Sequence, residues 1–201
     1  MVETLEYSVL KKDDNIEIRE YGHYILAQVD IDESFDDAIN KGFSILANYI
    51  FGGNKKSLKL AMTAPVSEEQ LNSEKIAMTT PVTEEEVTAS EKIAMTTPVT
   101  EEKTGRNFHR ISFSMPSKYK LETLPEPEDE KIHFKEFKDQ KIVALRFKGR
   151  VKEKLAKRKI EELKEWLSNN NFEPKSHFIV AQYNNPLVPG LLRRNEILVE
   201  I

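Results

Sequence analysis

The chain has 201 residues and a formal net charge of −4, and 32% of its residues are charged. This length is sufficient for one domain with a sizeable core, and the acidic balance argues against nucleic-acid binding, which needs a basic surface. The absence of cysteine excludes disulfide scaffolds, thiolate metal sites and cysteine nucleophiles. We find no apolar run of roughly 18 residues for a membrane span and no signal-peptide pattern in the charged first residues, so we expect a soluble cytoplasmic protein.

The first part of the chain predicts strands followed by an amphipathic helix. Apolar and polar residues alternate in three short runs separated by turn-forming residues, at 7–10, 16–21 and 24–31. Ser34 then provides a helix N-cap, and apolar residues recur at helical spacing until Gly52 and Gly53. We therefore predict a meander of strands and a helix over residues 35–51.

The second part of the chain repeats this order. Alternation predicts further strands at 110–115, 132–137, 142–147, 177–183 and 196–201. Between the third and fourth of these, an apolar stripe with interspersed Lys and Glu predicts a helix over residues 152–170 with an exposed charged face. Because the order strand, strand, helix, strand occurs twice, we predict an α+β fold in which two pseudo-symmetric halves form one antiparallel β-barrel flanked by two α-helices.

A short repeat separates the two parts. Three copies of the pattern Lys-[Leu/Ile]-Ala-Met-Thr-[Ala/Thr]-Pro-Val begin at Lys59, Lys75 and Lys92. Proline lacks an N–H and belongs at the edges or bulges of a sheet, so we predict that the extra copies are peripheral. Residues 67–105 hold 9 Glu and 3 Lys. Their net charge of −6 is more negative than the net charge of −4 of the whole chain. We interpret residues 1–201 as one domain with a repeated acidic insertion at about 67–105.

Candidate metal ligands are not grouped in the sequence. Thioethers can bind haem iron or copper(I), and one methionine recurs in each repeat copy, but methionine more commonly fills gaps in cores: Met62, Met78, Met95. No two of the four histidines stand at i, i+3 or i+4: His23, His109, His133, His177. We therefore predict no metal site. The chain also lacks a nucleophile elbow, a phosphate-binding loop and a His-Glu-x-x-His motif, so we expect no enzymatic activity.

The loop before the last strand suits a ligand pocket. Its apolar residues include Leu187 and Leu191, and they are followed by Arg193 and Arg194. Such a loop could close over a flat apolar ligand that carries carboxylates. The alternative is a loop packed on the barrel, with both arginines bound to carbonyl or acidic groups.

Eight short motifs follow one another along nearly the whole chain: Tyr7-x-Val9, Ile16-Glu-Ile-Arg19-x-Tyr21, Ala38-Ile-x-x-Gly42-Phe, Met62-Thr-Ala-Pro-Val66, Met115-Pro-Ser-x-Tyr119, Leu124-Pro-x-Pro127, Ala181-x-Tyr183-x-x-Pro186 and Arg194-Asn-Glu196. In this order they resemble the SOUL or haem-binding-protein family. The resemblance implies two pseudo-symmetric halves, an antiparallel barrel with two helices, and haem or another tetrapyrrole as a noncovalent ligand beside the first helix and the loop before the last strand.

The resemblance also suggests ligand-binding residues. The first helix places three residues on one stripe, and with the two loop arginines they form the predicted site: Asn40, Phe43, Ala47, Arg193, Arg194. Some relatives carry a histidine proposed as the iron ligand where this chain has Glu20, and others have cations where it has Asn40 and Asn48. We therefore expect weak or absent axial ligation by histidine, with affinity largely unchanged when each histidine is replaced by alanine.

The function implied by the resemblance is noncovalent binding of haem or a related tetrapyrrole for transport, buffering or sensing. One alternative is a binding module for another small hydrophobic effector, because a fold does not fix its ligand. A third possibility is a partner-binding protein that uses the acidic repeat, although charge runs are usually solvated faces.

Overall fold

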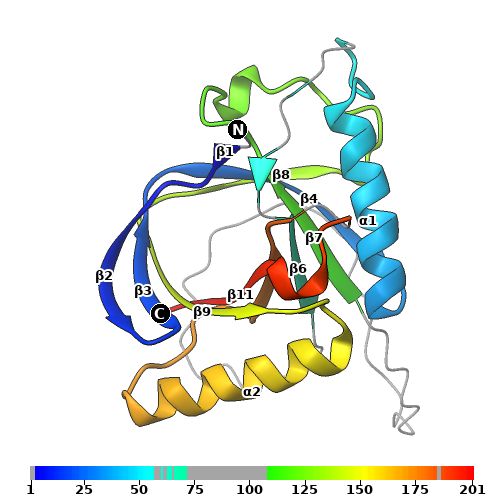
Figure 1. The fold of residues 1–201 in the computed structure, drawn as a ribbon. Helices are drawn as coiled ribbons and strands as arrows, with labels where there is room; N and C mark the ends of the chain where they lie inside the picture. The colour runs from blue at the N-terminus through cyan, green and yellow to red at the C-terminus, as the bar shows by residue number, and fades with distance from the viewer. Residues whose placement is uncertain (1–2, 57–59, 61–62, 65, 72–107, 185–186) are drawn as a thin grey trace, which may run out of the picture.

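A curled antiparallel sheet organises the molecule (Figure 1). The computed structural model describes residues 3–56, 60, 63–64, 66–71, 108–184 and 187–201. Within these residues nine strands follow one another across the sheet in the order β2 (Tyr7–Asp13), β3 (Ile16–Tyr21), β9 (Gln140–Lys148), β11 (Arg194–Glu200), β10 (Ile179–Gln182), β6 (Val66–Leu71), β7 (Phe108–Ser114), β4 (Tyr24–Asp32) and β8 (His133–Phe137).

The other elements lie around this sheet. Two short strands, β1 (Glu3–Thr4) and β5 (Thr63–Ala64), pair in parallel as a separate sheet. The helices are α1 (Phe35–Ile50) and α2 (Glu153–Asn169), and two 3-10 turns are η1 (Leu121–Thr123) and η2 (Gly190–Leu192). Figure 1 shows α1 along one side of the curled sheet and α2 beneath another part of it.

Both helices cover the outer face of the sheet. Leu46 and Ile50 of α1 pack in one core cluster with side chains of β4 and β7, including Val29 and Phe113. A second cluster joins α2 to β9 and β11 through residues such as Leu163, Leu145 and Ile197. Because alternate side chains of a strand point to opposite faces, the remaining residues of these strands face the inside of the curl.

Gly42 sets the distance between α1 and the sheet. A Cβ atom built on Gly42 would lie 2.6 Å from Cβ of Ile111 on β7. Real Cβ atoms do not approach this closely, so only glycine permits the present packing of the helix on β7. The close approach of α1 to β7 thus explains why the motif Ala38-Ile-x-x-Gly42-Phe contains a glycine at this position.

The α+β fold predicted from the sequence is confirmed, and both helices agree with their predicted ranges to within a few residues. The sheet is open at β2 and β8, so it forms a half-barrel. The sequence did not predict β6 as a separate strand, yet β6 lies inside the sheet between β10 and β7. Residues 67–71 of the predicted acidic insertion thus belong to the sheet, whereas its second and third repeat copies lie outside the described residues.

The connection between β6 and β7 provides a test of the predicted insertion. Leu71 and Phe108 are paired across the two strands, so a short connection is sufficient to join them. We expect deletion of residues 74–88, which is close to one repeat, to change the free energy of unfolding by less than about 1 kcal/mol. Urea denaturation of both proteins measures this difference, and loss of a cooperative transition in the deletion would place the extra copies in the core.

Within the described part of the chain, we find no helix that is both long and apolar enough to cross a membrane.

Candidate ligand-binding site

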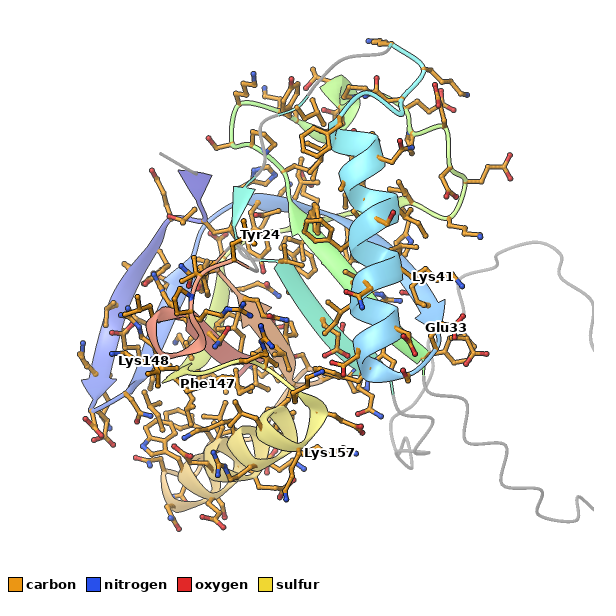
Figure 2. The ribbon with its side chains drawn as sticks, turned by 45° about the vertical axis from the view of Figure 1, so that its right-hand side comes forward. Tyr24, Glu33, Lys41, Phe147, Lys148 and Lys157 are labelled. Carbon is orange, nitrogen blue, oxygen red and sulfur yellow. The ribbon has the colours of Figure 1, made fainter. Side chains whose placement is uncertain are left out.

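The inner face of the curled sheet contains a cavity of about 530 Å³, which is within the usual range for small-molecule sites. The alternation of the strands explains its lining. Ile25 and Ala27 of β4 belong to the core under α1, so Leu26 and Gln28 point to the other face and line the cavity. We call this cavity the inner pocket. In Figure 2, Tyr24 lies within the curve of the sheet, away from Lys157 on α2.

Aromatic rings form one wall of the inner pocket. Tyr7 contacts Tyr21 with ring centroids 5.1 Å apart, and Tyr21 contacts Tyr24 at 6.0 Å. Tyr24 in turn stacks on Phe137 at 5.0 Å. These four rings come from β2, β3, β4 and β8, and a fifth lining ring, Tyr183, follows β10. Rings in this arrangement offer a flat apolar ligand a large contact area.

Cationic side chains also line the inner pocket. Lys135 and Lys175 are exposed, and Arg110 donates two hydrogen bonds to Asp30 at 2.7 and 2.8 Å. Arg194 lies over the ring of Tyr183, 4.3 Å from its centroid. A ligand that carries carboxylates therefore meets two exposed ammonium groups here, while both arginines are already paired with carboxylates and Glu69 and Glu200 share the lining.

A buried charge network lies beside the pocket. Arg19 is 1% exposed and donates two hydrogen bonds, at 2.7 and 2.9 Å, to Glu196, which is 0% exposed. Arg194 and the hydroxyl of Tyr183 donate to the same carboxylate. Burial by itself raises the pKa of Glu196, but the bonds and charges of Arg19, Tyr183 and Arg194 outweigh it and hold this pKa at about 2. A carboxylate with so low a pKa and so many donors is a poor general base and serves as a structural anion.

One wall residue has an unpartnered acceptor. Gln28 lines the inner pocket and donates through Nε2 to Oγ of Ser112 at 3.1 Å. Its Oε1 is buried and has no hydrogen-bond partner in the described part of the chain. A buried acceptor without a hydrogen bond lowers the stability of the folded protein. A ligand N–H or O–H that donates to Oε1 of Gln28 would therefore be bound favourably.

The structure separates the predicted site residues into two groups. Asn40 is exposed on α1, Phe43 packs against Phe113 with ring centroids 5.3 Å apart, and Ala47 is buried in the core under α1. Of the two arginines, Arg193 is buried and its Nε donates to the carbonyl of Val188 at 2.7 Å. Arg194 is the predicted residue that lines the inner pocket, and the other four lie outside its lining.

Glu20, the position at which some relatives carry a histidine, lies in a second hollow. Glu20 and His23 line this hollow of about 520 Å³, which shares Tyr7, Tyr21 and Tyr24 with the inner pocket. The aromatic wall thus stands between the two. The described residues hold no group of three or more His, Asp or Glu side chains that suits a metal ion. The three methionines of the repeat lie outside them.

Sequence reasoning missed most of the inner pocket. Several of its residues stood in the recognised motifs, including Tyr7, Tyr21 and Tyr183, but no pattern linked them to one another. The period-2 alternation of the strands was the available signal, because it places these side chains on one face of each strand. This alternation does not show which strands are neighbours in the sheet.

Comparisons with known proteins agree on the fold. The C-terminal domain of EcmrR matches with a TM-score of 0.61 at 12% identity, covering 96% of this chain and 96% of that one. An uncharacterized conserved protein from Listeria innocua matches with a TM-score of 0.56 at 9% identity, covering 92% and 91%. A protein described as a hydrolase from the same organism matches with a TM-score of 0.53 at 9% identity, covering 94% and 93%. At these identities the likeness concerns the fold alone.

Sequence comparison identifies the family. None of the curated protein sequences matches this chain. The model of the family described as "SOUL heme-binding protein" matches residues 2–200, which is nearly the whole chain. The motifs noted in the sequence, the curled antiparallel sheet with its two helices and this match agree, and the chain belongs to the SOUL heme-binding protein family.

Proposed function

We propose that this protein binds haem or a related tetrapyrrole noncovalently in the inner pocket, for transport, buffering or sensing. The observation that carries the proposal is the combination, in one cavity of about 530 Å³, of an aromatic wall with cationic side chains. A tetrapyrrole is a flat apolar ring system with carboxylate substituents, so both features match its chemistry. The family supports the same class of ligand.

Each group of pocket residues has a separate role in this proposal. The rings of Tyr21, Tyr24 and Phe137 contact the apolar macrocycle, since aromatic faces favour offset stacking. Lys135, Lys175 and Arg194 attract the carboxylates. Arg194 is the predicted site residue retained by this arrangement, and its pairing with Glu196 fixes its position before a ligand arrives.

The residues predicted on α1 define a rival location. Asn40 is exposed there, and the loop with Leu187 and Leu191 is exposed as well. A ligand held by Asn40, Phe43, Ala47 and Arg193 would lie on the outer face of the sheet. A substitution on α1 therefore distinguishes the two locations.

A different small hydrophobic effector is the second candidate ligand of the same pocket. The unpartnered Oε1 of Gln28 supports it, because this acceptor selects for a hydrogen-bond donor rather than for a macrocycle. Competition between haem and an apolar compound that carries a hydrogen-bond donor but no macrocycle separates tetrapyrrole recognition from general apolar binding, because only the second allows displacement of haem at similar concentrations.

Haem titration followed through the Soret band tests the proposal. We expect a saturable shift at micromolar protein, and we expect Lys135→Glu or Lys175→Glu to weaken binding roughly three- to tenfold, because each reverses the sign of an exposed charge at the pocket. Both side chains are exposed, so neither substitution should disturb folding.

Two further substitutions serve as controls for this titration. Arg158→Glu places the same charge reversal on the exposed face of α2, and we expect affinity to stay unchanged. Asn40→Glu adds a negative charge to α1, and a loss of affinity there but not at Lys135 or Lys175 would move the site to the outer face. Absence of any saturable shift in the wild type would overturn the proposal and favour another effector.

A further inference from the structure

One histidine of this chain lines the inner pocket. His177 precedes β10 and lies two residues before Ile179, so the two side chains point to the same face of the sheet, and both line the pocket. His109 is buried on the opposite face in contact with Phe35, while His23 and His133 are absent from the lining. No sequence pattern distinguishes these four histidines.

The partner of His177 orients its imidazole. Nδ1 of His177 lies 2.9 Å from Oε1 of Glu69 on β6, and the two residues are 108 positions apart in the chain. The pairing of Ile179 with Glu69 places them side by side on one face. A carboxylate oxygen can only accept, so Nδ1 carries the hydrogen of this bond and, in the neutral ring, Nε2 keeps its lone pair. Nε2 has no hydrogen-bond partner among the described residues.

Glu69 is itself held in place by its neighbours across the sheet. It is paired with Arg110 on β7, which is in turn paired with Asp30 on β4. Asp30, Arg110 and Glu69 thus form a row of alternating charge along the inner face, and His177 bonds to the Glu69 end of this row. The side chain of Glu69 is 17% exposed, whereas that of His177 is 49% exposed and accessible from the pocket.

Other pocket side chains are weaker candidates as iron ligands. A tyrosine binds iron as the phenolate, but burial raises the pKa of Tyr21 to about 12 and raises that of Tyr24 and Tyr183 as well. Met115 is buried in the core under α1. Imidazole held by a carboxylate at its other nitrogen is the arrangement that metal-binding histidines favour, because the bond fixes the ring and increases its basicity.

We propose that His177 is the axial ligand, through Nε2, of an iron tetrapyrrole in the inner pocket, and that Glu69 is the positioning residue that orients it. This inference rests on the proposed function. It differs from the expectation drawn from the sequence, in which no histidine ligated iron. Neither residue supplies chemistry beyond coordination.

Spectra of the ferric and ferrous haem complexes of the full-length protein test the assignment. We expect His177→Ala to lose the absorption and resonance Raman signatures of a histidine ligand and to bind haem roughly 10- to 100-fold more weakly, and we expect added imidazole to restore the spectrum. Metal-free protoporphyrin should bind to wild type and His177→Ala with equal affinity, because it has no iron. Glu69→Gln should retain coordination but lower the iron–histidine stretching frequency.

The controls are His23→Ala and His133→Ala, which we expect to leave the spectra unchanged. If wild type binds haem and His177→Ala retains its affinity and spectrum, the ligand assignment is wrong although the proposed function stands. If protoporphyrin binding falls together with haem binding, His177 acts on the shape of the pocket and not on iron. If wild type shows no Soret shift, the protein does not bind haem, and both the proposed function and the ligand assignment are wrong.

Discussion

Replacing Arg19 with alanine is expected to lower the free energy of unfolding by about 3–5 kcal/mol, because it leaves the fully buried carboxylate of Glu196 without its bidentate partner. Arg194 and Tyr183 still donate to that carboxylate, but they were already bound to it and replace neither lost bond. Urea denaturation at neutral pH measures the loss. A change below about 1 kcal/mol would show that the network contributes little to stability.

The chain offers a matched control for this prediction. Arg110 makes the same two-bond contact with Asp30, but the side chains are 24% and 36% exposed. Because exposed ion pairs are screened by water, Arg110→Ala should cost less than about 1 kcal/mol. Replacing Arg19 and Glu196 together with Met and Leu should cost less than Arg19→Ala alone, since no fully buried charge is then left unpaired. Arg194 and Glu17 each lose one partner in this variant, but their side chains are 29% and 17% exposed.

The loss at Arg19 should also depend on pH. The pKa of Glu196 is lowered in the folded protein from an ordinary value of 4.5 to about 2, so the stability it contributes is present above about pH 4.5 and is lost as the pH falls toward 2. In Arg19→Ala this pKa rises, since the largest compensation for burial is gone. The difference in stability between the two proteins should therefore shrink between pH 7 and pH 3. A constant difference over this range would show that Arg19 acts through packing alone.

Gly42→Ala is expected to lower the free energy of unfolding by about 1–2 kcal/mol. Overpacking a core costs roughly 1–3 kcal/mol, and alanine recovers at most about 1 kcal/mol through its higher helix propensity. The new Cβ would meet Cβ of Ile111 at 2.6 Å, and this atom is part of a β-branched side chain that cannot rotate away. Thermal or urea unfolding measures the change.

Gly22 is the control for this second substitution. A Cβ atom built there meets nothing within 4 Å. We expect Gly22→Ala to change stability by less than about 0.5 kcal/mol, or to raise it slightly by restricting the unfolded chain. If Gly42→Ala were as well tolerated as Gly22→Ala, α1 would be free to move away from β7, and the close approach would not be a requirement of the fold.

The helices were well predicted because their patterns are local. The apolar stripe of α1, its Ser34 start and its Gly52 end lie within a few turns of one another, and the helix is observed over Phe35–Ile50. The same holds for strands such as β3, whose alternation covers Ile16–Tyr21. The sequence did not predict the strand β6 because this strand follows a repeated segment that contains proline, and its apolar and polar residues do not alternate regularly.

The sequence predicted the residues of the inner pocket less well than the fold. Arg194 was proposed from the sequence and lines the inner pocket, while Asn40, Phe43 and Ala47 were chosen for their common stripe on a helix. A stripe shows which residues share a face, but it does not show what covers that face. In the structure the sheet covers much of it, through contacts such as that of Phe43 with Phe113.

The sequence by itself determined the α+β class, the two helices, most strands and the family, because propensity and periodicity are properties of neighbouring residues. Only the tertiary structure decided the order and register of the strands, since these depend on side chains that meet across long separations in the chain. Arg19 and Glu196 are 177 positions apart, and His177 and Glu69 are 108 apart. Strands β3, β9 and β11 bring Arg19 and Glu196 together, and β6 and β10 bring Glu69 and His177 together. The buried charge network and the proposed iron-binding histidine with its carboxylate partner therefore form only when the sheet forms.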